Sequence, residues 1–190
     1  MTVHDGRGLT VRVGSGLLLA GLLCGCTEPA DLTPVPTEAS GPYACDGVPQ
    51  QGPELILGGP APVDRPRQPG TRRTAPLWRC TFDDGERRLV VKDELLTASG
   101  DFGPDEESTL AFLRSVPGTQ RVEADSPGEG YAGESIAAWV CEGRIVTVEL
   151  ISKPIPERDA QEDVTNLLLS QLPFVCDGVA MPEAGDPGEG

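Results

Sequence analysis

The sequence predicts an α+β fold: an antiparallel four-stranded sheet made of two hairpins, with two main helices packed on one face. Segments in which apolar and polar residues alternate occur in pairs, and a segment with a helical apolar stripe follows each pair. The order ββα–ββα therefore runs through the chain. Its halves are marked by Trp-x-Cys elements, Trp78–Cys80 and Trp139–Cys141, which start 61 residues apart. One sequence leaves open whether the repetition is a duplication.

The first hairpin is expected between residues 77 and 95. The segment Leu77–Phe82 places Trp78 and Cys80 on the same face, which is the period-two pattern of a half-buried strand. Asp83-Asp84-Gly85 has the composition of a turn, and Glu86–Leu95 resumes extended structure. Together they predict a β-hairpin.

A helix is predicted to follow over Pro104–Val116. It begins with proline and three acids, which favour a helix N-terminus, and it carries Leu110 and Leu113 on one stripe. Pro117-Gly118 ends it. A shorter helix is predicted over Pro53–Gly59, with proline at its start and glycines at its end.

The second half repeats this plan. Ser135–Cys141 and Arg144–Ile151 are predicted strands, and Glu142-Gly143 is the turn between them. A helix is predicted over Asp159–Leu172, where an aspartate followed by a glutamate three residues later resembles a capping box. Pro173 ends that helix.

The N-terminal 25 residues have the features of a secretory signal peptide. Arg7 and Arg12 precede the short apolar run Leu17–Leu23, which is too short for a stable membrane span. The order Leu, small residue, Gly, Cys resembles the lipobox of bacterial lipoproteins. It implies cleavage behind Gly25 and lipid modification of Cys26. Cys24 is the weaker candidate for that modification, and an ordinary secretory signal is the alternative.

Three further regions are expected after the signal. Residues 26–42 are Pro-rich and polar and predict an extended tether that reaches about 50 Å. Residues 43–180 have the length of one domain, and residues 181–190 predict a disordered acidic tail. The protein is thus expected at the extracytoplasmic face of the cell membrane.

The four remaining cysteines predict two disulfides, because their number is even and the protein is expected to be exported. Pairing in sequence order gives Cys45–Cys80 and Cys141–Cys176. The nested pairing, Cys45–Cys176 with Cys80–Cys141, stays open as an alternative. A structural zinc site is disfavoured because no cysteine pair has ligand spacing and His4, the only histidine, lies in the signal.

The net charge of −15 argues against nucleic acid or an anionic membrane surface as a partner. One basic run, Ala61–Thr74, carries four arginines. It could meet lipid phosphates or an acidic polymer, and internal neutralisation or solvation is the simpler interpretation.

No catalytic constellation is predicted. The mature chain has no histidine to act as a base beside a nucleophile. The acidic pairs Asp83/Asp84 and Glu106/Glu107 are explained by a turn and a helix start, and the sequence predicts no metal or cofactor. We therefore expect that the protein is not an enzyme, with carboxylate-dependent catalysis as a remote alternative.

The lipobox, the Pro-rich tether and a cysteine heading the segment Cys45–Gly58 together resemble small actinobacterial lipoproteins of unknown function. The segment Gly128-Glu129-Gly130-Tyr131-Ala132 is similar to the Gly-x-Gly-x-Ala element of those proteins, but it departs from it at Glu129 and Tyr131. The layout also resembles exported sensor domains of mycobacterial-type receptor kinases. This resemblance implies an α+β lipoprotein domain and assigns no catalytic residue.

The resulting hypothesis is a non-catalytic binding module for an envelope protein, a cell-wall component or a small ligand. An accessory or sensor-like subunit of a membrane complex is the alternative. The binding surface is expected on the loops Ala61–Thr74 and Ser126–Glu134, with Glu129 and Tyr131 as contact residues. Gly128 and Gly130 would allow close approach of a partner. Alternatively, Tyr131 simply packs on the domain.

Overall fold

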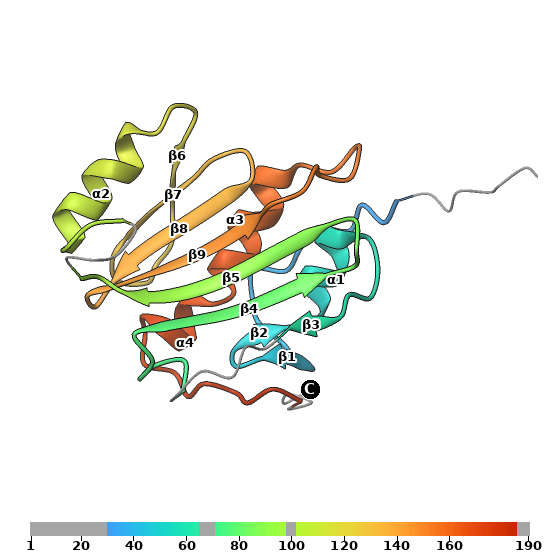
Figure 1. Cartoon of the computed structure of the whole chain (residues 1–190), viewed down its shortest axis with the longest axis horizontal. Helices are drawn as coiled ribbons and strands as arrows, with labels where there is room; N and C mark the ends of the chain where they lie inside the picture. Colours follow the sequence, from blue (N-terminus) through green and yellow to red (C-terminus); the bar gives the residue numbers. More distant parts are fainter. Residues whose placement is uncertain (1–29, 65–70, 98–101, 186–190) are drawn as a thin grey trace, which may run out of the picture.

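A seven-stranded antiparallel sheet forms the centre of the molecule, in the order β3-β4-β5-β9-β8-β7-β6 (Figure 1). The computed structural model describes residues 30–64, 71–97 and 102–185. The strands of this sheet are β3 (Val63–Asp64), β4 (Leu77–Asp83), β5 (Arg88–Leu95), β6 (Gln120–Val122), β7 (Glu129–Ala132), β8 (Ile136–Cys141) and β9 (Arg144–Leu150). A separate two-stranded ribbon pairs β1 (Tyr43–Cys45) with β2 (Val48–Pro49).

The predicted four-stranded sheet is therefore wrong in its extent. The four expected strands are present as β4, β5, β9 and β8, and they are the central strands of the sheet. Three short strands extend it at the edges. Each has two to four residues, which is too short for an alternating pattern to stand out in the sequence.

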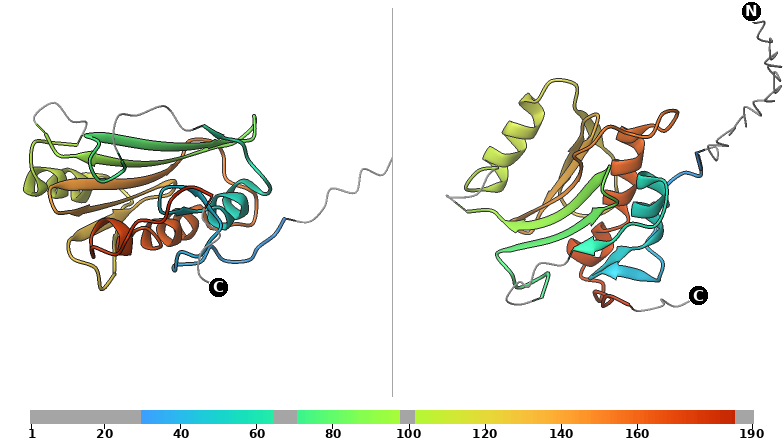
Figure 2. Two further views of the ribbon diagram at one scale, coloured as in Figure 1. Left: turned by 90° about the horizontal axis from the view of Figure 1, so that it is seen from below. Right: turned by 45° about the vertical axis from the view of Figure 1, so that its right-hand side comes forward.

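Three helices lie on one face of the sheet (Figure 2, left). They are α1 (Gln51–Leu57), α3 (Ala160–Leu169) and α4 (Leu172–Val175). Apolar residues of α1 and α3 form one core with the inward side chains of the central strands, including Val91, Val148 and Trp139. The expected helix starts are confirmed for α3, whose N-cap Asp159 accepts a hydrogen bond from the Glu162 backbone N–H at 3.0 Å.

The fourth helix, α2 (Glu106–Ser115), packs on the opposite face of the sheet, so the prediction of two helices on one face is also wrong. Its Leu113 contacts a small core that contains Ala138, Val140 and Ile145. The physical reason lies in β8, whose residues after Ile136 are buried on both faces. A strand that is apolar on both faces needs a covering layer on each side.

The chain on either side of residues 43–180 also contacts the domain. Val35, in the predicted tether, is only 2% exposed and belongs to the main core. Two residues of the predicted tail form hydrogen bonds with the start of the domain: the Pro182 carbonyl accepts from the Gly47 N–H, and the Gly185 N–H donates to the Tyr43 carbonyl. Residues 30–42 and 181–185 thus lie along the domain surface. The rest of both predicted regions, with the signal peptide and Cys26, falls outside the described residues.

Both predicted disulfides are present with the sequence-order pairing. Cys45 is bonded to Cys80 and Cys141 to Cys176, and each pair is separated by 35 residues. The nested alternative is excluded. Within the described ranges, no helix is long and apolar enough to cross a membrane.

Candidate functional site

Glu129 and Tyr131, the two predicted contact residues, lie together on the face of β7 that α2 covers in part. Arg114, near the C-terminal end of α2, completes a cluster with them. Its Nη2 donates to both carboxylate oxygens of Glu129 at 2.9 Å, and its Nε donates to the Tyr131 hydroxyl at 2.8 Å. The Tyr131 hydroxyl in turn donates to Glu129 Oε1. Arg114 was not predicted, because nothing in the local sequence of α2 links it to residues 15 and 17 positions later.

The electrostatics of this cluster favour the charged forms of its members. The hydrogen bond from Tyr131, and then the one from Arg114, hold the pKa of the Glu129 carboxyl below its ordinary value. The hydrogen bonds to Tyr131 and then to Glu129 raise the pKa of the Arg114 guanidinium. The cluster is therefore a neutralised, hydrogen-bonded group that fixes the end of α2 to β7. The Tyr131 ring is half-buried against the small core under α2, so it packs on the domain as the alternative interpretation expected, and the Arg114 Cζ lies 5.9 Å from its centre.

The segment Ser126–Glu134 is not entirely the loop that was predicted, since β7 occupies its four central residues. Its two glycines allow close packing within the domain. A Cβ atom built on Gly130 would lie 2.4 Å from Cε3 of Trp139, and one built on Gly128 would lie 2.1 Å from the Val140 carbonyl oxygen. The Trp139 indole N–H donates to the Pro127 carbonyl at 2.9 Å. The glycines were expected to allow close approach of a binding partner, but the group that packs closely against them is Trp139 of the same domain.

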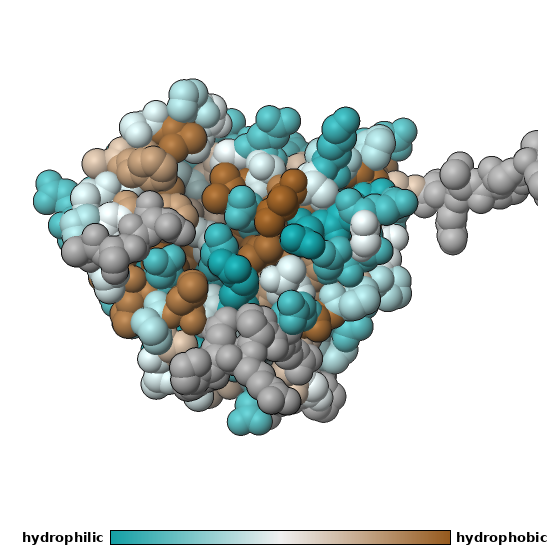
Figure 3. Space-filling view, viewed as in Figure 1, coloured by the Kyte–Doolittle hydropathy of each residue, from teal (hydrophilic) through white to brown (hydrophobic). Residues whose placement is uncertain are grey.

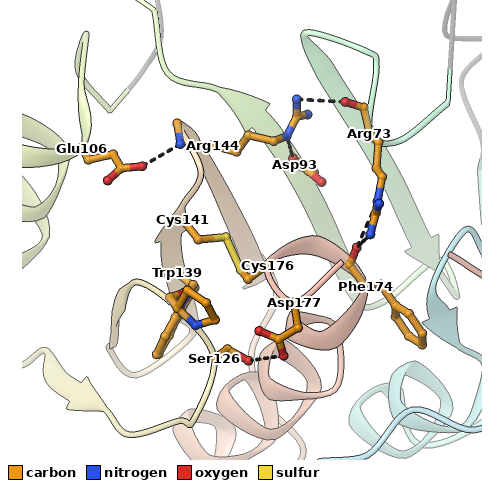
Figure 4. Close-up of a disulfide and its surroundings, with 12 residues drawn as sticks. Arg73, Asp93, Glu106, Ser126, Trp139, Cys141, Arg144, Phe174, Cys176 and Asp177 are labelled. Carbon is orange, nitrogen blue, oxygen red and sulfur yellow. Dashed lines mark hydrogen bonds and ion pairs between the residues drawn. A yellow bond between two sulfur atoms is a disulfide. The ribbon is translucent and has the colours of Figure 1, made fainter. Parts of the chain in front are cut away.

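Of the described arginines of the basic run, Arg72 forms an internal ion pair, whereas Arg73 is exposed and donates to backbone carbonyls. Arg72 is fully buried, and its Nε donates to Asp93 Oδ2 at 3.3 Å. Arg144 donates to the other oxygen of Asp93 at 2.5 Å (Figure 4). Burial lowers the pKa of the Arg72 guanidinium. This buried cluster, Arg72–Asp93–Arg144, fixes the segment before β4 to the sheet. Arg65 and Arg67 fall outside the described residues.

Arg73 and the second disulfide attach the C-terminal segment next to this cluster (Figure 4). The Arg73 guanidinium donates to the Phe174 carbonyl at 2.6 Å, and Cys176 is bonded to Cys141 beside the Trp139 ring. Asp177 accepts a hydrogen bond from the Ser126 hydroxyl at 2.8 Å. These contacts hold α4 and the segment after it in place.

The acidic pair in the turn has the local role that the sequence suggested, whereas Glu106 makes a contact 37 residues away. Asp84 accepts from the backbone N–H groups of Glu86 and Arg87 in the β4–β5 turn, and these bonds lower its pKa. The Glu106 carboxylate accepts from the Gly143 N–H at 2.6 Å, which ties the start of α2 to the β8–β9 turn. Among the described residues, no group of three or more His, Cys, Asp or Glu side chains is placed to hold a metal ion.

The surface depressions are open and are lined by both polar and apolar residues. One of 680 Å³ lies beside the start of α3, between Glu134, Glu157 and Gln161. An adjoining one of 360 Å³ runs along α3 toward Arg121. Figure 3 shows the side of the molecule that carries the open face of the sheet, where apolar and hydrophilic residues are interspersed.

α2 presents an aromatic residue to solvent in the middle of its outer surface. Phe112 is 48% exposed, and its ring meets Phe102 edge-on at 6.3 Å between ring centres. Figures 1 and 2 place α2 at the end of the molecule away from the point where the N-terminal segment joins it. The candidate site is the α2 surface, defined here as the exposed Phe112 and, on another side of the helix, the cluster of Arg114, Glu129 and Tyr131.

Comparison of the chain with protein-family models, with curated proteins and with solved structures finds no match.

Proposed function

We propose that this chain is an exported, lipid-anchored binding module, and that it binds an envelope protein through the α2 surface. The lipid anchor is proposed from the lipobox resemblance at Cys26. The two disulfides support export, because such bonds persist in oxidising compartments. Non-catalytic binding is proposed because the described ionisable side chains at the site are engaged with one another.

The composition and position of the α2 surface carry this proposal. Phe, Tyr and Arg are the side chains enriched in the buried centres of protein interfaces. Arg114 and Glu129 already neutralise each other, so covering them with a partner leaves no unpaired charge. If Cys26 anchors the chain, α2 lies at the end farther from the bilayer, where a second envelope protein has access to it.

The test is site-specific photocrosslinking in intact cells. A photoreactive phenylalanine analogue replaces Phe112 in one strain and Ile151 in another. Ile151 is 56% exposed and follows β9, away from α2, so it is the matched control. We expect a discrete adduct from position 112 only. Added wild-type domain should suppress that adduct, and a domain carrying Phe112→Ser and Arg114→Ala should not.

Two outcomes contradict the proposal. Equal adducts from positions 112 and 151 would show that the partner does not bind specifically at the α2 surface. Turnover of an envelope substrate by the purified domain would overturn non-catalytic binding itself.

A further inference from the structure

The N-terminal segment is held on the domain by one buried ion pair. Arg158 lies just before α3, and its Nε and Nη2 donate to the two carboxylate oxygens of Asp163 at 2.8 and 2.6 Å. Both side chains are nearly buried, with 3% and 9% of their surface exposed. Such a bidentate pair fixes the position of the guanidinium.

The remaining nitrogen of Arg158 binds the incoming chain. Nη1 donates to the Thr33 carbonyl at 3.1 Å and also to the Asp31 carbonyl. A guanidinium presents its donors in a rigid fork, so one arginine can join α3 and the N-terminal segment. The backbone of residues 31–33 is thus hydrogen-bonded to a side chain that cannot move without breaking a buried pair.

Val35 provides a second, independent attachment. Its side chain enters the main core, next to Gly52 of α1 and Leu167 of α3. Gly52 has no Cβ, and a Cβ built there would lie 3.4 Å from Val35 Cγ1 and 2.9 Å from Leu167 Cδ1. The fit at this position is therefore close. Ion pair and apolar contact together hold residues 31–35 on the domain surface.

We infer that the domain sits directly at the bilayer surface in a fixed orientation, with the residues around Arg158 facing the lipid headgroups. This inference rests on the proposed lipid anchor at Cys26. Four peptide links join Cys26 to Ala30, the first described residue, and a chain of that length spans at most about 14 Å. The headgroup region occupies about 5–8 Å of that distance on each side of the bilayer.

The orientation has a consequence for the partner. An undocked tether over residues 26–42 would let the domain rotate and move up to about 50 Å from the membrane. With residues 31–35 docked, α2 lies at the end of the molecule away from the anchored segment and so away from the bilayer. The α2 surface is thus accessible to a protein located beside the domain or farther from the membrane. The opposite end of the domain contacts the lipid headgroups.

The test measures the height of the domain above a membrane. Full-length lipidated protein carries one fluorophore on Ile151→Cys and is reconstituted in phosphatidylcholine vesicles that contain an acceptor-labelled lipid. We expect strong energy transfer in this protein. Arg158→Gln and Val35→Ser should each lower the transfer, because each removes one of the two attachments. The double variant should raise the mean height by up to about 35 Å, because the whole tether is then released. Lys153→Gln removes a positive charge from the same loop and should leave the transfer unchanged.

A second measurement separates the two proposals. The soluble chain that begins at Thr27 is cut with endoproteinase Glu-C, and cleavage after Glu38 is followed by mass spectrometry. Docking predicts slow cleavage, several times faster in both variants, since the protease needs a locally released segment. Failure of the full-length protein to bind vesicles contradicts the lipid anchor alone. Equal cleavage in the wild type and in both variants overturns the docking.

Discussion

Trp139 lies flat against β7 because two residues of that strand region lack a side chain. A Cβ on Gly130 would approach the tryptophan ring to 2.4 Å and the Ala138 carbonyl oxygen to 2.6 Å. The second atom belongs to the backbone of β8, which cannot move aside without disturbing the pairing of β8 with β7 and β9. The fit of Trp139 thus depends on hydrogen at position 130.

Gly130→Ala should lower the free energy of unfolding by about 1–3 kcal/mol, the usual cost of overpacking a core. Gly133→Ala is the matched control one residue beyond the same strand. There the nearest atom would lie 3.6 Å from the new Cβ, which is an ordinary contact. Urea unfolding followed by tryptophan fluorescence measures both. An equal stability for the two variants would show that Trp139 does not require this glycine.

The buried cluster Arg72–Asp93–Arg144 could not be predicted, because the sequence does not show which distant residues form ion pairs. Nothing in the sequence distinguished the buried arginine from the other three arginines of the basic run. Asp93 lay in a predicted strand, and no partner for it could be identified. The partners of Asp93 lie 21 and 51 residues away and meet only in the folded chain. The same holds for Arg114 at the α2 surface, whereas Glu129 and Tyr131 were close enough in sequence to be considered together.

At the scale of the element, the hairpins and helices with strong local signals were predictable. The β4–β5 and β8–β9 hairpins and helices α1, α2 and α3 occur close to where the pattern placed them. Two helix ends were wrong: α1 begins two residues before Pro53, and α3 stops at Leu169, so that Pro173 lies inside the separate helix α4. The β7 strand was missed because glycine disfavours strands, and here tertiary packing against Trp139 overrides that preference. The placement of α2 had a visible signal, since Ser135–Cys141 is apolar at nearly every position and so lacks a solvent face.

Helix α2 should be the element that loosens first in acid. Its N-cap Asp105 accepts from the Ser108 backbone N–H at 2.8 Å, which lowers the pKa of Asp105. The pKa of Glu129, near its other end, is also lowered. A carboxyl whose pKa is lowered by folding stabilises the fold above its ordinary pKa, about 3.9–4.3, and that stabilisation is lost as the pH falls through the lowered value.

Amide NMR signals of α2 should therefore stay constant between pH 7 and 5 and shift or broaden below about pH 4. Asp105→Asn removes one of the titrating groups and should reduce this acid response near the start of the helix. Glu107→Gln removes a carboxylate from the same turn but leaves the cap intact, so its response should match the wild type. Simultaneous loss of all backbone signals of the domain would instead indicate global unfolding without a separate α2 step.

At the scale of the whole molecule, each of the two disulfides attaches one terminal segment of the domain to a strand of the central sheet. Cys45–Cys80 joins the β1–β2 ribbon to β4, and Cys141–Cys176 joins β8 to the segment after α4. Each bond therefore ties a terminal part of the domain to a strand within its own half of the chain. The sequence allowed this pairing and its nested rival, because loop lengths alone do not determine which cysteines meet.

Because both bonds close steps of 35 residues, the chain-entropy model assigns each of them about 4 kcal/mol. This is a large part of the 5–15 kcal/mol that is typical of a folded domain. The double variants Cys45→Ala/Cys80→Ala and Cys141→Ala/Cys176→Ala should each lose about that amount in denaturant unfolding. Peptide mapping should find the other bond intact in each case.

Equal loops also make the comparison informative, because loop entropy cancels between the two variants and any difference reports the local packing. The second bond lies beside the Trp139 ring and holds the segment that Arg73 binds, so its loss disturbs both of these contacts. We therefore expect the Cys141→Ala/Cys176→Ala protein to be the less stable of the two. If it were the more stable, the contacts around α4 would hold the C-terminal segment without the bond, and Arg73 and Asp177 would be its principal attachments.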